Sequence, residues 1–138
     1  MAENLGLYKD LKILLAEDNP INQRVTVLIF NKLNLKCDIA SNGKEAFEKY
    51  QNIPYDLIFM DLQMPVMDGL ESARLIRSYE KDTQSLHKAV IIALTGNEIS
   101  DNRFICMEAG MDYFMEKPIR IEFLQEYISG FLQDLNTV

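Results

Sequence analysis

The sequence predicts an α/β domain in which five parallel strands alternate with five helices. Three observations carry this prediction: short apolar runs recur along the chain, the stronger runs are continuous rather than alternating, and a segment with helical periodicity follows each run. Continuous apolar runs are typical of strands that are covered on both faces, as in a parallel sheet. Regular alternation of strand and helix favours right-handed crossovers between those strands.

Five apolar runs mark the predicted strands. Four of them are strongly apolar, whereas the last, Tyr113 to Met115, is weaker. The predicted strands cover residues 11–16, 37–40, 57–60, 89–94 and 113–115.

The predicted helices have recognisable boundaries. Asn19 is a good N-cap with Pro20 in the first helical position, and Asn42 has the spacing of a capping box with the glutamate three residues on. The third helix is expected to begin near Gly69, and the fourth to run over residues 100–109 until a glycine stops it. Each helix should bury one apolar stripe. The expected stripes are Ile21, Val25, Leu28 and Ile29; Ala46, Phe47 and Tyr50; Leu70, Ala73 and Ile76; and Ile121, Leu124, Ile128, Leu132 and Leu135.

Length and composition indicate one globular domain. A chain of 138 residues can bury a core without disulfide or metal staples, and we expect a lead-in over residues 1–10 and the domain over residues 11–138. Hydrophobic residues make up 48% and charged residues 25%, which argues against disorder. The formal net charge of -7 would repel a phosphate backbone, so direct binding of nucleic acid is not expected.

The cysteines and the apolar runs favour a cytoplasmic location. Cys37 and Cys106 each stand alone in sequence and are expected to be reduced thiols within the core. No run is long enough to span a bilayer, and the first residues do not resemble a secretory signal. We therefore expect a cytoplasmic domain that makes no membrane contact.

Reactive side chains follow four of the predicted strands. Glu17 and Asp18 come after the first strand, Asp61 after the third, Thr95 after the fourth and Lys117 after the fifth. Ligands of open parallel sheets bind at the carboxyl ends of the strands. Each residue alone could be a turn, a cap or a surface charge, but their coincidence at four strand ends favours a functional site.

Three carboxylates at one edge of a sheet need a compensating charge. Two carboxylates 4 Å apart repel by roughly 4 kcal/mol at an effective dielectric near 20. A hard divalent cation such as Mg²⁺ would offset this repulsion, and Lys117 would offset only part of it. The same cation and ammonium would neutralise a phosphoryl group that is attacked by a carboxylate.

These residues resemble those of response-regulator receiver domains over nearly the whole chain, from about residue 11 to residue 132. The motifs that carry the resemblance are Leu14-Leu15-Ala16-Glu17-Asp18-Asn19, Met60-Asp61-Leu62-Gln63-Met64-Pro65-Val66-Met67-Asp68-Gly69, Ala93-Leu94-Thr95 and Glu116-Lys117-Pro118. The resemblance implies a flavodoxin-like (βα)5 fold with the strand order 2-1-3-4-5.

The resemblance also implies a role for each site residue. Asp61 would be the phosphoacceptor, and Mg²⁺, with Mn²⁺ as an alternative, would be held by Glu17, Asp18, Asp61 and the backbone carbonyl of Gln63. Thr95 and Lys117 would contact the phosphoryl group.

The resemblance extends to a conformational switch. Thr95 and the aromatic Phe114 are expected to form it, and the bond before Pro118 is expected to be cis. Gln63 and Asn97 occupy positions that tune the lifetime of the phosphoryl group in the family, and Gly96 leaves room for a docking histidine.

The implied partner is a histidine kinase or a histidine phosphotransfer domain. The segments from Glu17 to Gln23 and from Glu108 to Asp112 resemble receivers of hybrid sensor histidine kinases, so the kinase could belong to a longer parent chain. A stand-alone response regulator is the alternative. The domain itself is not expected to be a turnover enzyme.

Three other functions fit the sequence less well. A phosphohydrolase with an aspartate nucleophile generally needs a second carboxylate where Gln63 stands. A flavin-binding domain would not place Glu17 and Asp18 beside a phosphate. A degenerate receiver would not retain the reactive residues. His87, the single histidine, is expected to lie on the surface at the opposite end of the sheet.

Overall fold

The computed structural model describes residues 11–96 and 99–136, and it confirms the predicted α/β fold. All five strands of the sheet are parallel, and their order is β2-β1-β3-β4-β5, as the resemblance implied. The strands are β1 (Ile13–Ala16), β2 (Cys37–Ala40), β3 (Leu57–Asp61), β4 (Val90–Thr95) and β5 (Tyr113–Glu116). The lead-in expected over residues 1–10 lies outside the described residues.

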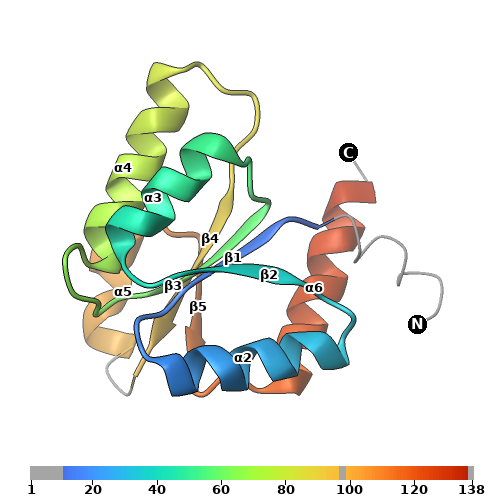
Figure 1. Ribbon diagram of the computed structural model, residues 1–138. Helices are drawn as coiled ribbons and strands as arrows, with labels where there is room; N and C mark the ends of the chain where they lie inside the picture. The colour runs from blue at the N-terminus through green and yellow to red at the C-terminus, as the bar shows by residue number, and fades with distance from the viewer. Residues whose placement is uncertain (1–10, 97–98, 137–138) are drawn as a thin grey trace.

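The helices form a layer on each face of this sheet (Figure 1). One layer holds α2 (Pro20–Lys32) and α6 (Ile121–Asn136), and the other holds α3 (Gly43–Asn52), α4 (Gly69–Asp82) and α5 (Ile99–Glu108). Successive side chains of a strand point to opposite faces of a sheet, so each central strand contributes to both layers. This explains why the sequence shows continuous apolar runs in β1, β3 and β4.

The two faces of the sheet have separate hydrophobic cores. Beneath α3, α4 and α5, the core contains Leu14, Ala46, Tyr50, Ile58, Ala73, Ile76, Ile91 and Cys106. Beneath α2 and α6, it contains Ile13, Leu15, Phe30, Leu57, Phe59, Ile92, Leu124 and Ile128. The stripes predicted for α3 and α4 are therefore confirmed. The side chains of Leu132 and Leu135 lie outside the described residues.

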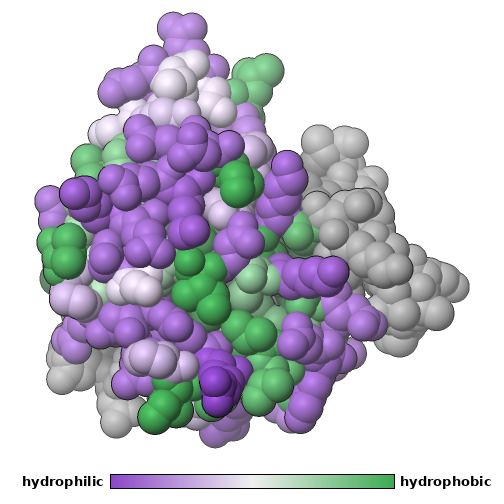
Figure 2. All heavy atoms as spheres, viewed as in Figure 1, coloured by the Kyte–Doolittle hydropathy of each residue, from purple (hydrophilic) through white to green (hydrophobic). Residues whose placement is uncertain are grey.

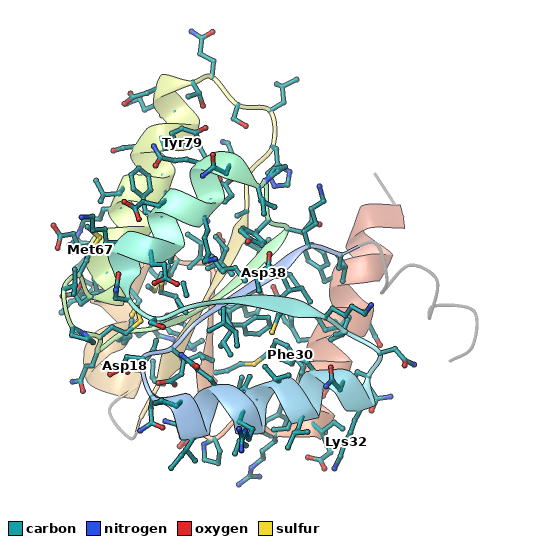
Figure 3. All side chains as sticks on the ribbon, in the orientation of Figure 1. Asp18, Phe30, Lys32, Asp38, Met67 and Tyr79 are labelled. Atoms are coloured by element: carbon teal, nitrogen blue, oxygen red, sulfur yellow. The ribbon has the colours of Figure 1, made fainter. Side chains whose placement is uncertain are left out.

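The buried stripe predicted for α2 is wrong except for Ile29, which packs against the core. The helix instead buries Thr26 and Phe30, and the Phe30 ring packs on Phe59 of β3 at 5.2 Å between centroids. Figure 3 shows Phe30 pointing from α2 toward the sheet. Three residues of the predicted stripe face solvent instead. Their exposed fractions are 73% for Ile21, 44% for Val25 and 56% for Leu28. Helical periodicity identifies apolar stripes but does not say which of two stripes faces the sheet.

Side-chain caps begin three helices at the carboxyl end of the sheet. Asn19 Oδ1 accepts hydrogen bonds from two backbone N–H groups of α2, at 2.8 and 3.1 Å. Asn42 Oδ1 accepts from Glu45 N–H at 2.8 Å, as the capping-box spacing predicted, and Asp68 Oδ1 accepts from Glu71 N–H at 2.8 Å. The first two caps turn the chain from a strand end into a helix, and the third ends the loop after β3, so the edge of the sheet lies among helix N-termini.

A buried polar network occupies the opposite end of the sheet. Glu80 of α4 is 3% exposed and accepts hydrogen bonds from Tyr50 Oη, from the Ala89 N–H and from Arg77 Nη1. Arg77 also contacts Asp112 at 2.7 Å and donates to two backbone carbonyls, so it connects α4 to the turn before β5. This network was not predicted from the sequence.

His87 and the cysteines differ in part from expectation. His87 does precede β4 at the end of the sheet opposite the acidic residues, but its ring is half-buried and its Nε2 lies 2.8 Å from the Tyr55 carbonyl oxygen. His87 therefore lies at the expected end of the sheet, with its ring partly covered. Both cysteines are free, with Cys106 buried and Cys37 half-buried. None of the helices in the described part of the chain is long and apolar enough to cross a membrane.

Candidate functional site

The topology brings the predicted site residues to one edge of the sheet. β1 lies beside β3, and β3 lies beside β4, so the residue that ends β3 stands between the ends of its neighbours. Ala16 pairs with Met60 and Asp61 pairs with Leu94, which places Glu17 and Thr95 on either side of Asp61. Lys117 follows β5, and its N–H donates to the Thr95 carbonyl at 2.7 Å.

Three carboxylates form the centre of this site. Oxygen atoms of Glu17, Asp18 and Asp61 all lie within 4.8 Å of one another. Asp18 is exposed, whereas the side chains of Glu17 and Asp61 are only 3% and 6% exposed. Figure 3 shows Asp18 where the chain turns from β1 into α2. The site is thus buried on the side of the sheet and open beside Asp18.

One ammonium group faces the two buried carboxylates. Lys117 Nζ lies 3.0 Å from Asp61 Oδ2 and 3.6 Å from Glu17 Oε1. The peptide bond between Lys117 and Pro118 is cis. Three carboxylates against one ammonium leave the site with an excess of negative charge.

The excess charge is visible in the pKa values. Burial raises the pKa of Glu17 above its usual range, and the charges of Asp61 and Asp18 raise it further, against the lowering effects of the Asn19 N–H and of Lys117. Burial alone would lower the pKa of Lys117, but its hydrogen bond and its attraction to Asp61 and Glu17 raise that pKa overall. Both directions show a site that would gain from more positive charge.

Local backbone geometry fixes the acidic side chains. Asp61 Oδ1 accepts from the Gln63 N–H at 3.2 Å, and Glu17 Oε2 accepts from the Asn19 N–H at 3.1 Å. Gly69 begins α4 directly against β3, where an added Cβ would lie 2.2 Å from the Asp61 carbonyl oxygen. Only glycine allows this close approach, which brings the loop after Asp61 back over the strand end.

Thr95 supplies a hydroxyl group without a partner. Its Oγ1 is buried and has no hydrogen-bond partner among the described residues. A buried hydroxyl that lacks a partner costs free energy, so such an atom calls for a ligand or a water. Thr95 follows the residue paired with Asp61, and its hydroxyl is therefore a donor available to a group attached to Asp61.

The predicted aromatic residue lies on the neighbouring strand. Phe114 of β5 pairs with Ala93, is half-buried and packs against the core beneath α3, α4 and α5. The guanidinium of Arg103 on α5 lies over its ring, 5.3 Å from the centroid. Asn97, the other position expected to affect the site, lies outside the described residues.

A divalent cation fits the donor set. The ligands are carboxylate oxygens, which suit hard cations such as Mg²⁺, and the site has more negative charge than Lys117 can offset. The carbonyl of Gln63, expected as a further ligand, belongs to the loop that Gly69 brings back over Asp61.

Sequence reasoning missed one polar contact at the site. Gln23 of α2 donates from its side-chain amide to the backbone carbonyl of Glu17. The only signal in the sequence is an amide residue about one helical turn after the N-cap, and that signal is weak because glutamine is common on exposed helix faces.

Comparison with known proteins agrees with the fold. A model of the response regulator receiver domain matches residues 13–129. The chain therefore belongs to the response-regulator receiver family.

The most similar curated proteins include hybrid kinases. The chain is 40% identical over 121 residues to hybrid signal transduction histidine kinase K of Dictyostelium discoideum, covering 86% of this chain and 10% of that protein. It is 37% identical over 144 residues to histidine kinase 5 of Arabidopsis thaliana, covering 88% and 16%. The chain thus spans only a small part of the length of these relatives.

Solved structures include two informative receivers. The receiver domain of the sensor histidine kinase PA1611 from Pseudomonas aeruginosa has a TM-score of 0.74 and 35% identity, covering 85% of this chain and 93% of that one, and it holds a magnesium ion in its active-site cleft. The Saccharomyces cerevisiae receiver of Ssk1, in complex with the histidine phosphotransfer protein Ypd1, has a TM-score of 0.79 and 30% identity, with 88% of both chains covered.

Proposed function

We propose that this domain accepts a phosphoryl group from a phosphohistidine onto Asp61 and signals through the resulting change of conformation. The observation that carries the proposal is the surroundings of the Asp61 carboxylate. It is nearly buried, it lies within 4.8 Å of two other carboxylates, and an ammonium and a nearby hydroxyl stand ready to contact a new anionic group.

The transfer is a displacement at phosphorus. A carboxylate oxygen of Asp61 attacks the phosphorus, the P–N bond of the phosphohistidine breaks, and the imidazole nitrogen keeps the bonding electron pair. Lys117 Nζ, now 3.0 Å from Asp61 Oδ2, is placed to contact a phosphoryl oxygen. The free Thr95 hydroxyl donates to another one. These contacts hold the negative charge that arrives with the phosphoryl group.

Mg²⁺ is the proposed cofactor, and Mn²⁺ could replace it. Glu17, Asp18 and Asp61, together with the Gln63 carbonyl, would hold the ion. When bound, it supplies positive charge that neutralises the carboxylates and the transferred phosphoryl oxygens. The magnesium ion in the PA1611 receiver supports this assignment.

The proposed switch begins at Thr95. A phosphoryl group on Asp61 draws the Thr95 hydroxyl toward it, and the space that Thr95 vacates lets Phe114 turn inward. Arg103 stacks on the Phe114 ring, so a turn of the ring would also release a contact of α5. Moving such a switch from mostly off to mostly on requires about 5.5 kcal/mol, more than one or two hydrogen bonds supply, so phosphorylation alone should switch the domain only in part.

The exposed stripe of α2 is the proposed docking surface for the phosphohistidine partner. Ile21, Val25 and Leu28 project from the helix that begins beside Asp18. Figure 2 shows hydrophobic side chains gathered over α2 at the lower edge of the molecule. A cavity of about 250 Å³ between Val25 and Pro118 connects this stripe to Glu17 and Lys117.

A histidine phosphotransfer domain or a histidine kinase is the proposed partner. The Ssk1 receiver binds a protein of the first kind, and apolar surface of this extent beside a reactive site favours a protein partner over a small molecule. The parent protein is proposed to be a hybrid histidine kinase, because the curated relatives are of that type. A stand-alone regulator remains the alternative.

Phosphorylation by a small donor tests the proposal. The domain is incubated with acetyl phosphate, with and without Mg²⁺, and its intact mass is followed for wild type and Asp61→Asn. We expect one phosphoryl adduct that requires Mg²⁺ and is absent from the variant. An adduct of equal yield in Asp61→Asn would rule out Asp61 as the acceptor, and rapid repeated hydrolysis of the donor would favour a phosphohydrolase instead.

A further inference from the structure

Gln23 holds the peptide from which the acidic pair projects. Its Nε2 donates to the backbone carbonyl oxygen of Glu17 at 2.5 Å. Gln23 belongs to the first turns of α2, and the cap of that helix, Asn19, lies just after the pair. The helix therefore contacts the acidic turn through a side chain as well as through its N-terminus.

The Glu17 peptide lies just beyond the end of the sheet ladder. The last paired residue of β1 is Ala16, which pairs with Ala40 of β2 and Met60 of β3. The Glu17 N–H still donates to the Ala40 carbonyl at 3.0 Å, but the Glu17 carbonyl lies past the pairing. The amide of Gln23 supplies the hydrogen bond that a neighbouring strand would otherwise give.

Three hydrogen bonds together restrain the turn. The N–H of Glu17 is held by Ala40, its carbonyl by Gln23, and its carboxylate by the N–H of Asn19. The N–H and the carbonyl of Glu17 belong to the two peptide groups on either side of its Cα, and the bond from Gln23 holds the second of these, which joins Glu17 to Asp18. Its orientation sets the direction in which the next residue, Asp18, leaves the backbone.

Asp18 depends on this restraint more than its neighbours do. The carboxylates of Glu17 and Asp61 are buried and contact Lys117, so packing and charge keep them in place. Asp18 is exposed, and burial does not restrict its rotation. The direction of Asp18 toward the cluster therefore rests on the backbone that Gln23 holds.

We propose that Gln23 is a positioning residue that sets the affinity of the acidic cluster for its divalent cation, an inference that rests on the proposed function. Groups that orient metal ligands without touching the metal commonly change metal affinity by about 10–100-fold when they are removed. Loss of the Gln23 amide frees the Glu17 peptide, so the ion must restrain it on binding, and the affinity falls.

A neutral donor suits this position. A lysine or arginine would donate to the same carbonyl but would add positive charge beside a cation site and lower its affinity. A glutamate would be an acceptor facing an acceptor. Glutamine gives the hydrogen bond without changing the charge of the site.

Two substitutions and a matched control test the inference. Gln23→Met keeps the length of the side chain and removes the donor, and Gln23→Ala removes the side chain in a residue that favours helix. Arg24→Met is the control, because Arg24 is the exposed next residue of the same helix. Mg²⁺ binding is measured by calorimetry at low temperature, and phosphorylation by acetyl phosphate is measured over a range of Mg²⁺ concentrations.

We expect the Mg²⁺ dissociation constant to rise about tenfold in both Gln23 variants and to stay within about twofold in the control. At saturating Mg²⁺ the phosphorylation rate should return to within about twofold of wild type, because Gln23 touches none of the reacting atoms. A purely structural role would lower the melting temperature and leave the dissociation constant unchanged, and that result overturns the inference.

The remaining outcomes also support or overturn the inference about Gln23. If wild type binds Mg²⁺ and the Gln23 variants bind it with the same affinity, the role of Gln23 is overturned and the proposed function stands. If wild type binds no Mg²⁺, both are overturned. If neither variant folds, the side-chain amide signal of Gln23 in wild type is followed by ¹⁵N NMR. A signal that shifts with Mg²⁺ at the same midpoint as the calorimetric binding supports the inference, and an amide that does not respond overturns it.

Discussion

The Glu17 carboxylate is held in a place where its negative charge is costly. Burial first, and then the charges of Asp61 and Asp18, raise its pKa above the ordinary 4.5. A carboxyl group with a raised pKa binds its proton more tightly in the folded chain than in the unfolded chain. Without metal, this group therefore favours folding below pH 4.5, and its contribution is lost as the pH rises through the raised pKa.

Glu17→Gln should for this reason stabilise the metal-free domain at pH 7. We expect the free energy of unfolding to rise by about 1 kcal/mol, because the cost of burying the charge and its repulsion by Asp61 exceed the weakened hydrogen bond from Asn19 and the lost attraction to Lys117. The difference should vanish at about pH 3, where the carboxyl group is protonated in both states. Urea unfolding in EDTA at the two pH values measures it, with the exposed Glu126→Gln as control. A variant less stable than wild type at pH 7 would contradict the argument.

Mg²⁺ should reverse that order. A ligand that binds only the folded state stabilises it by about 2.7 kcal/mol at a concentration of one hundred times its dissociation constant. Glu17→Gln removes one of the proposed ligands and should gain less from the ion than wild type does. The same site is thus a weakness of the fold without metal and a support for it with metal.

At the scale of elements, α2 has two apolar stripes and uses them differently. Thr26 and Phe30 face the sheet, and the stripe that contains Leu28 faces solvent. A helix with apolar residues on an exposed face usually has a partner there. The helix would then serve both as a cover for the core and as a docking surface.

Leu28→Asp should impair transfer from a phosphohistidine protein and spare transfer from a small donor. Using phosphorylated yeast Ypd1 as donor, we expect a loss of about tenfold or more, because a charge would be buried in the interface without a partner. Phosphorylation by acetyl phosphate should be unchanged. Leu86→Asp, at a fully exposed leucine after α4, is the control and should affect neither reaction. Equal loss with both donors would show that α2 acts on the site rather than on docking.

The contact between α3 and the loop after β3 is the second feature at this scale. The Gly43 N–H donates to the Met67 carbonyl at 2.8 Å, and Ser72 Oγ donates to the Gly43 carbonyl at 2.8 Å. Figure 3 shows Met67 in this loop, at the same end of the sheet as Asp18. An added Cβ on Gly43 would lie 2.5 Å from the Met67 carbonyl oxygen.

Gly43→Ala should therefore push α3 away from the loop that carries Gln63. We expect the free energy of unfolding to fall by about 1–3 kcal/mol, because the contact is with backbone that cannot yield. Gly130→Ala in α6 is the matched control, since nothing lies within 4 Å of its added Cβ, and it should stabilise by about 0.5–1 kcal/mol through helix propensity. Chemical denaturation of both variants measures the difference, and a Gly43 variant as stable as wild type would contradict the steric argument.

At the scale of the whole molecule, the proposed phosphorylation site and the buried polar network around Glu80 lie at opposite ends of one sheet. The acidic cluster occupies the carboxyl end, and the network of Glu80, Arg77 and Tyr50 occupies the other. The four strands of the sheet that carry the site residues run between them. Substitutions in the network around Glu80 should therefore change the free energy of unfolding and leave the rate of phosphorylation at the other end unchanged.

Arg77→Met tests this separation. It leaves the 3%-exposed Glu80 without its cation and should lower the free energy of unfolding by about 3 kcal/mol or more. Arg74→Met, at an exposed position of the same helix, should change it by less than about 0.5 kcal/mol. Well below the melting temperature, both variants should accept phosphate from acetyl phosphate at the rate of wild type. A slow Arg77 variant that is still folded would show that the two ends are coupled.

The sequence predicts those parts of the molecule that depend on neighbouring residues. Strand positions, the caps at Asn19 and Asn42, and the convergence of Asp61 with Glu17 and Asp18 follow from apolar runs and from the rule that parallel strands share one edge. The orientation of α2 did not follow, because two apolar stripes compete and only the fit of Phe30 on Phe59 decides between them.

Two polar contacts were not predicted because the sequence gives no sign of the partner. Glu80 looks like an ordinary surface residue in sequence, and only the fold brings Tyr50 and the start of β4 to it. Gln23 contacts a backbone atom, and such a contact leaves no complementary residue in the sequence that could suggest the pairing.

The two helix layers, one on each face of the sheet, determine which proteins can bind this domain at the same time. The α2 surface belongs to one layer, and α5, which holds Phe114 through Arg103, belongs to the other (Figure 1). A protein that loads the domain from α2 leaves the far layer uncovered. A phosphoryl donor bound at α2 therefore need not exclude a second protein bound at α5. One domain of this size has room for both proteins at the same time.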